Sequence, residues 1–128
     1  MSLKIDVDRA GPDEAAITLT GELNSATAAA CDKELTTVLA PELKTLILNL
    51  KHLKYISSAG LRLVLKARKQ LEKQGGRLAL RHMSAPVAKV FEIAALIPPD
   101  VQASRRSEDI FLDAVQRREA VRHHDISD

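Results

Sequence analysis

Aromatic residues are scarce in this chain of 128 residues, which has one Tyr, two Phe and no Trp. The core must therefore be built from Leu, Ile, Val and Ala, and base-stacking surfaces for single-stranded nucleic acid are not expected. The formal net charge is only +2, so direct binding to nucleic acid is not expected either. The one cysteine, Cys31, excludes an internal disulfide bond and a zinc cluster built from cysteines.

Long apolar runs are also missing. No stretch reaches the ~20 apolar residues of a membrane span, and the first residues lack the apolar segment of a signal peptide. We therefore expect a cytoplasmic protein that does not bind membranes. Its length and 45% hydrophobic content suit one domain, which we place at 1–121, with a polar tail at 122–128. We expect neither a cofactor nor a metal, because His123 and His124 lack further ligands nearby.

The hydrophobic pattern predicts an α/β fold. In the first half of the chain we expect strands at 3–9 and 15–21, a helix capped by Asn24 or Ser25 and ended by Pro41, and a strand at 45–50. A helix at 58–73, a strand through Leu78 and Leu80 and a helix capped by Ser84 should follow. The last expected elements are an edge strand at Val101 and a helix from Ser107 that includes Phe111. Alternating strands and helices after residue 44 predict a parallel sheet, to which the first hairpin adds antiparallel strands. We expect a mixed sheet of four to five strands flanked by about four helices.

Two adjacent serines stand where the buried strand at 45–50 leads into the helix at 58–73. Unpaired N–H groups and the helix dipole favour negative charge at such a helix start. On a helical wheel Ser57 points toward the apolar stripe and is expected to cap the helix, whereas Ser58 lies about a third of a turn away. Ser58 is therefore the better candidate for accepting a phosphate.

Ser58 shares one strip of the helix with apolar and basic residues, namely Leu61, Arg62, Leu65 and Lys69. Apolar anchors beside positive charge are typical of a surface that binds a protein partner. A phosphate on Ser58 would add about −1.5 to −2 charges in the middle of this strip. The plainer interpretation is that both serines only cap the helix, a contribution of roughly 1 kcal/mol.

These features resemble those of the bacterial anti-sigma factor antagonists, which are small stand-alone STAS domains. The resemblance covers roughly residues 4 to 115. Its landmarks are Leu19-Thr20-Gly21-Glu22-Leu23-Asn24, Leu46-Ile47-Leu48-Asn49-Leu50, Ser57-Ser58-Ala59-Gly60-Leu61, Gly75-Gly76-Arg77-Leu78 and the segment 87–96.

The resemblance implies a partner switch that regulates transcription. The unphosphorylated protein would bind an anti-sigma factor with serine kinase activity and so release a sigma factor. Phosphorylation of Ser58, or less favourably of Ser57, would end binding, and a serine phosphatase would reverse it. The residues implied in partner binding are Glu22, Asn24, Ser57, Ser58, Leu61, Arg62, Leu65 and Lys69. Ser57 and Asn24 stand where the family has aspartates, which reduces charge repulsion on a phosphate.

Two other functions are compatible with parts of the sequence. A STAS subunit could bind a sensor or transporter complex constitutively, without being phosphorylated. A hydrolase could use Ser58 as nucleophile and His82 as base, but the first glycine of the nucleophile elbow is replaced by Ile56. We therefore do not expect an enzyme.

Overall fold

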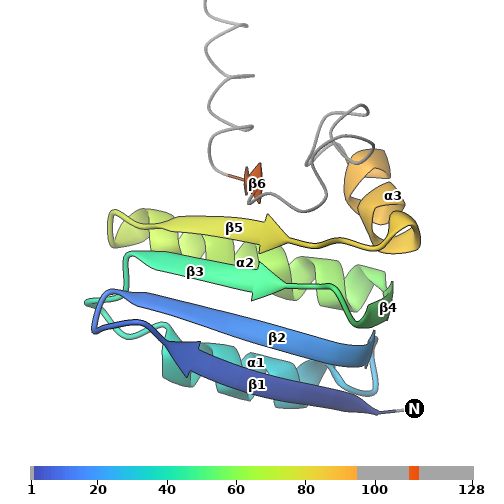
Figure 1. Cartoon of the computed structure of the whole chain (residues 1–128), viewed down its shortest axis with the longest axis horizontal. Coiled ribbons are helices and arrows are strands. Elements are labelled where there is room, and N and C mark those ends of the chain that lie inside the picture. Colours follow the sequence, from blue (N-terminus) through green and yellow to red (C-terminus); the bar gives the residue numbers. More distant parts are fainter. Residues whose placement is uncertain (1, 95–109, 113–128) are drawn as a thin grey trace, which may run out of the picture.

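The computed structural model describes residues 2–94 and 110–112, with the strands and helices shown in Figure 1. Within these residues the strands are β1 (Leu3–Arg9), β2 (Glu14–Leu23), β3 (Thr45–Asn49), β4 (Leu53–Ile56), β5 (Arg77–Arg81) and β6 (Ile110–Phe111). The helices are α1 (Ala28–Val38), α2 (Ser58–Lys73) and α3 (Ala85–Ile93).

The strands form one mixed sheet in the order β1-β2-β3-β5-β6, and β4 pairs with β2. Strand β2 is parallel to β3 along its first half and to β4 at its end, and β3 is parallel to β5. Strand β1 is antiparallel to β2, so the predicted hairpin around Gly11-Pro12-Asp13 is confirmed. The parallel centre with antiparallel additions agrees with the fold class predicted from the sequence.

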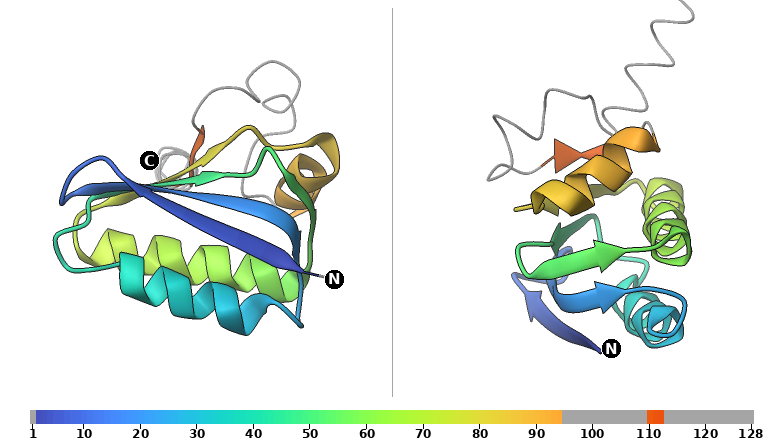
Figure 2. Two further views of the ribbon diagram at one scale, coloured as in Figure 1. Left: turned by 60° about the horizontal axis from the view of Figure 1, so that its bottom comes forward. Right: turned by 90° about the vertical axis from the view of Figure 1, so that its right-hand side faces the viewer.

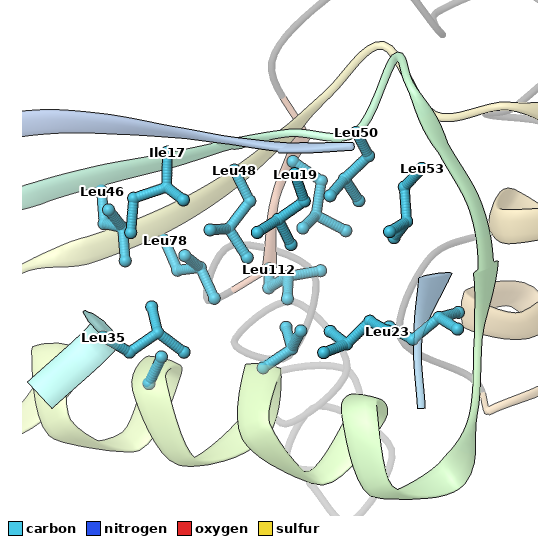
Figure 3. Packing of buried hydrophobic residues seen from close by; sticks show 14 of the residues in the cluster. Ile17, Leu19, Leu23, Leu35, Leu46, Leu48, Leu50, Leu53, Leu78 and Leu112 are labelled. Atoms are coloured by element: carbon cyan, nitrogen blue, oxygen red, sulfur yellow. The ribbon is translucent and has the colours of Figure 1, made fainter. Parts of the chain in front are cut away.

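Helices α1 and α2 cover one face of the sheet, and α3 packs beside β4 at the end of the molecule (Figure 2). Buried side chains, among them many leucines, fill the space between the sheet and these two helices (Figure 3). On α2 the buried residues are Gly60, Val64, Ala67 and Leu71, whose spacing of three or four residues places them on one face of the helix. The sheet therefore fixes the orientation of α2, and with it the direction in which Ser58 points.

Three details of the fold differ from the prediction. Within the described residues the sheet has six strands instead of four to five. The segment that forms β4 was not predicted as a strand. Only Leu53 and Ile56 of its four residues are buried, so it shows no alternation. Helix α1 begins after Thr27, not after Asn24 or Ser25. The carbonyl oxygen of the Asn24 side chain instead accepts hydrogen bonds from the backbone N–H groups of Ala26 and Thr27 in the preceding turn, at 2.9 and 3.1 Å.

The third difference concerns the last predicted helix. Ile110–Phe111 form a strand antiparallel to β5, and the adjacent Leu112 is fully buried in the core. Phe111 was assigned to a helix face, but it pairs with β5 at the edge of the sheet, because tertiary pairing outweighs local preference. Three of the expected helices lie within the described residues. The predictions for Val101, Ser107 and the polar tail fall outside them.

Candidate functional site

The ends of β2 and β4 form the base of the predicted serine site. Leu23 pairs with Ile56, and the backbone N–H of Ser57 donates to the carbonyl oxygen of Leu23 at 2.9 Å. Asn24 and Ser57 therefore follow directly from two paired residues, as the resemblance implied. We call this region, from Glu22 to Asn24 and from Ile56 to Gly60, the strand-end edge.

Ser57 is the N-cap of α2, as predicted. Its backbone is extended, with φ −94° and ψ 176°, and its side-chain oxygen accepts a hydrogen bond from the backbone N–H of Gly60 at 3.3 Å. This bond satisfies one of the unpaired N–H groups of the first helical turn. The Ser57 hydroxyl is half-buried and engaged in the cap, so it is the less accessible of the two serines.

Gly60 holds the start of α2 against the strand-end edge. A Cβ atom at this position would lie 2.7 Å from Cγ of Leu23 and 2.9 Å from Cγ1 of Ile56. Both distances are shorter than a normal carbon–carbon contact of about 3.5 Å. The glycine is therefore required by close approach, and it lets the first turn of α2 sit directly on the ends of β2 and β4.

Ser58 is the first residue of α2, and its side chain is exposed. Its position at the helix N-terminus puts it where the helix dipole stabilises negative charge. Among the described residues, no hydrogen bond engages its hydroxyl, whereas the neighbouring Ser57 hydroxyl is used in the cap. The structure thus separates the two serines in the way the helical wheel predicted.

Every residue of the predicted strip on α2 is at least partly exposed. Leu61 and Leu65 are half-buried and pack against the edge of the core, while Arg62 and Lys69 are exposed. Lys66, on another face of the helix, forms a salt bridge of 3.0 Å with Asp32 of α1. The strip thus combines half-buried apolar side chains with exposed positive charges. Its residues are Ser58, Leu61, Arg62, Leu65 and Lys69.

Asn24 and Glu22 lie at the strand-end edge, but Asn24 has mainly a structural role. Only 9% of Asn24 is exposed, and its side-chain N–H donates to Oε1 of Glu22 at 3.4 Å. The Thr27 hydroxyl donates to the backbone oxygen of Glu22 at 2.9 Å and accepts from the backbone N–H of Asn24 at 2.9 Å. Hydrogen bonds among its own residues therefore hold the turn, and Glu22 is the acidic residue of the strand-end edge.

Sequence reasoning missed Tyr55, which pairs with Glu22 in the sheet and is 50% exposed. A large, exposed aromatic side chain two residues before the cap adds apolar area to the strand-end edge. Tyr55 is the only tyrosine of the sequence, so the residue itself could be singled out from the composition. Its exposure could not be foreseen, because β4 itself was not predicted.

The other chemical candidates gain no support. Among the described residues, no hydrogen bond joins His82 to Ser58. His82 instead occupies the turn after β5, with a positive φ of 59°. Burial raises the pKa of Cys31 to about 11, so this thiol stays protonated at neutral pH. In the part of the chain that the structure describes, no cluster of possible metal ligands occurs and no helix is long and apolar enough to cross a membrane.

Comparisons with known proteins agree with this geometry. The sequence profile of the STAS domain matches residues 5–100. BtrV of Bordetella bronchiseptica, whose assignment as an anti-sigma factor antagonist is provisional, is 40% identical over 79 residues, which are 62% of this chain and 68% of BtrV.

Among solved structures, the anti-sigma factor antagonist SpoIIAA in its unphosphorylated form is 28% identical, with a TM-score of 0.67 over 73% of this chain and 82% of that chain. SpoIIAA of Bacillus in its phosphorylated form is 26% identical, with a TM-score of 0.62 over 73% of this chain and 85% of that one. The match to the STAS domain at residues 5–100 runs from within β1 to beyond α3. The chain belongs to the STAS domain family.

Proposed function

We propose that this protein is an anti-sigma factor antagonist that works by partner switching. In this proposal the unphosphorylated strand-end edge and the strip on α2 bind an anti-sigma factor that is also a serine kinase, which frees a sigma factor. Phosphorylation of Ser58 ends the complex, and a serine phosphatase restores it. The observation that carries the proposal is the exposed Ser58 hydroxyl at the N-terminus of α2, beside the capping Ser57.

The surroundings of Ser58 suit a reversible phosphate. The helix N-terminus stabilises the added charge, and Arg62, one turn further along, lies on the same face for a charge-assisted hydrogen bond. The fold therefore tolerates the modification, since the cap and the Gly60 contact do not involve the Ser58 hydroxyl. The similarity to SpoIIAA, a protein known in phosphorylated and unphosphorylated forms, supports the same cycle here.

The effect on binding follows from where the charge arrives. The phosphate would stand next to Leu61 and Leu65, the apolar anchors of the strip, and would bring about −1.5 to −2 charges with its hydration shell. A partner that covers these leucines would have to desolvate the phosphate, which is strongly unfavourable without a matching cation. Binding is thus lost while folding is retained.

Ser57 and Asn24 replace the aspartates that the resemblance leads one to expect. Neither replacement carries charge, so Glu22 is the acidic side chain contributed by this part of β2. We expect the weaker negative field to ease phosphate transfer to Ser58. We also expect it to change which kinase and phosphatase recognise the site.

The experiment is a pull-down from the native cell lysate, with and without ATP, using the wild type, Ser58→Ala and Ser57→Ala as baits. The intact mass of each bait is recorded. We expect the wild type and Ser57→Ala to gain one phosphate and release a kinase-like partner, while Ser58→Ala stays unmodified and keeps it. Equal masses and identical partners for all baits would contradict the switch.

The constitutive STAS subunit is the competing function, and Ser58→Asp separates the two. The substitution places a negative charge at the modified position without any kinase. In a switch, Ser58→Asp abolishes capture of the partner, and Ser58→Asn, its uncharged match, does not. In a constitutive subunit both variants retain the partner.

A further inference from the structure

Strand β1 forms an outer edge of the sheet, well away from α3 (Figure 1). Its seven residues, Leu3–Arg9, pair with β2 along their whole length. On its other side no strand of the described residues lies beside it. An open edge of this length can pair with a further strand through its backbone.

The hydrogen bonds to β2 show which backbone groups of β1 are open. The carbonyl oxygen of Ser2 accepts from the N–H of Glu22 at 3.2 Å, and the N–H of Ala10 donates to the oxygen of Glu14 at 3.0 Å. Residues along an antiparallel strand face the partner strand alternately. Even-numbered residues therefore bond to β2, and the backbone groups of Leu3, Ile5 and Val7 point outward.

The side chains of β1 divide in the same way between the two faces of the sheet. Leu3 and Ile5 pack against the core on the helix-bearing face, where Val7 also lies and is 40% exposed. Lys4, Asp6 and Asp8 are exposed on the opposite face. Strand β1 thus places apolar side chains on the helix-bearing face of the sheet, and both positively and negatively charged side chains on the opposite face.

We propose that β1 pairs antiparallel with β1 of a second copy of this chain, with Ile5 opposite Ile5 at the two-fold axis. In this register Leu3 lies opposite Val7 of the second copy, and the outward backbone groups of all three residues bond across the axis. Lys4 lies opposite Asp6 of the second copy, twice by symmetry. The two sheets join into one continuous sheet with matched apolar and charged sides.

Charge selects this register over its neighbours. A shift by two residues keeps the hydrogen-bonding pattern, but it puts Asp6 opposite Asp6 and the apolar Leu3 opposite Arg9. A shift by one residue brings backbone groups that bond to β2 against the outward groups of the other copy, and it places apolar side chains opposite charged ones. Direct opposition of like charges is unfavourable, whereas opposite charges stabilise the pair.

The expected association is weak and sensitive to salt. Pairing of two short strands buries less surface than a stable dimer interface, and the Lys4–Asp6 pairs are exposed to solvent and therefore screened. We expect a monomer–dimer equilibrium that shifts toward dimer with protein concentration and back toward monomer with added salt.

The test is sedimentation velocity of the full chain over a range of concentrations, with Lys4→Glu and Asp6→Lys measured alone and as an equal mixture. Each variant alone sets like charges opposite each other twice, so its dimer should weaken at least about tenfold. In the mixture Glu at position 4 faces Lys at position 6, and Asp6 faces Lys4. The mixture should therefore regain dimer.

Three further variants test the proposed register and whether β1 is the strand that pairs. Asp8→Lys should leave association unchanged, because Asp8 faces Ser2 in the proposed register but would face Lys4 in the shifted one. Val7→Pro removes an outward N–H and should abolish the dimer, while Arg9→Pro removes one beyond the paired segment and should not. A monomer at all concentrations overturns the proposal. So does a dimer that neither Val7→Pro nor the single charge reversals weaken.

Discussion

The strand-end edge and the β1 edge belong to one sheet, yet they offer a partner different chemical groups. At the strand-end edge the backbone is used internally, since the N–H of Ser57 bonds to Leu23 and the N–H of Gly60 bonds to the Ser57 side chain. At the β1 edge the backbone groups of Leu3, Ile5 and Val7 point away from β2, and no other strand of the described residues pairs with them. Recognition at the first edge therefore depends on side chains, which a phosphate can change, and recognition at the second depends on the backbone.

This difference also predicts how each edge responds to substitution. Apart from the exposed Ser58, the strand-end edge is tightly packed, so a change at its other residues affects folding as well as binding. The β1 edge is exposed on its charged side, so a change there affects association alone. The following predictions, given in order of expected size, test this contrast.

Gly60→Ala should have the largest effect on stability. Alanine would gain about 1 kcal/mol in helix propensity, but its Cβ would overlap Leu23 and Ile56, and overpacking of this kind costs up to about 3 kcal/mol. We expect a net loss of about 2 kcal/mol in the free energy of unfolding, measured by chemical denaturation. The loss should shrink in the background of Leu23→Ala, which removes the closest contact. An unchanged midpoint would show that the strand-end edge is loosely packed.

Cys31 belongs to neither edge, because it lies on α1 in the core. Its pH dependence can therefore be compared with the effects of substitutions at the two edges. Burial raises its pKa from 9.0 to about 11, with Asp32 and Glu34 contributing further. The folded state holds the proton more tightly than the unfolded state, so the associated stability is complete below pH 9 and is lost as the pH rises toward 11. At pH ~10 the loss should be about 1.4 kcal/mol.

The matched variant for this pH prediction is Cys31→Ala. It should be less stable at neutral pH, because it loses buried volume, but its further decline between neutral pH and pH ~10 should be smaller than that of the wild type by about 1.4 kcal/mol. Parallel pH profiles of the two proteins would contradict the assignment.

Ser57→Ala and Ser58→Ala compare two adjacent hydroxyls. Loss of the cap should lower the free energy of unfolding by about 1 kcal/mol in Ser57→Ala. Ser58→Ala should stay within about 0.5 kcal/mol of the wild type, because its hydroxyl is exposed and outside the cap. Thermal or urea denaturation measures both. Equal losses would mean that both serines serve mainly to start the helix.

Lys4→Glu and Asp6→Lys should have the smallest effect on folding. Both side chains are exposed on β1, and surface substitutions of this kind usually change the free energy of unfolding by less than about 0.5 kcal/mol. Denaturation at low protein concentration, where the chain is monomeric, measures this. A larger loss would show that the β1 edge also contributes to the fold of the single chain.

Much of the fold could be predicted because its signals are local. The apolar spacing of α2 fixed its bounds as 58–73, and the glycine pair at 75–76 marked its end, where Gly75 adopts a φ of +74°. The alternating pattern of the first hairpin gave β1 to the residue. Strand β4 and the strand at Ile110–Phe111 were missed, because they are short and owe their structure to pairing with β2 and β5.

The sequence by itself determined that two hydroxyls stand at the start of an amphipathic helix, because caps and helical periodicity depend on neighbours in the chain. Only the tertiary structure decided how these hydroxyls differ in their surroundings. The close approach of Gly60 to Leu23 and Ile56 seats the helix on the sheet, the cap occupies Ser57, and Ser58 is left exposed. The tertiary structure also decided that β1 pairs with β2 alone among the described strands. The alternation of apolar and polar residues indicates that a segment forms a strand, but it does not indicate how many neighbouring strands it has.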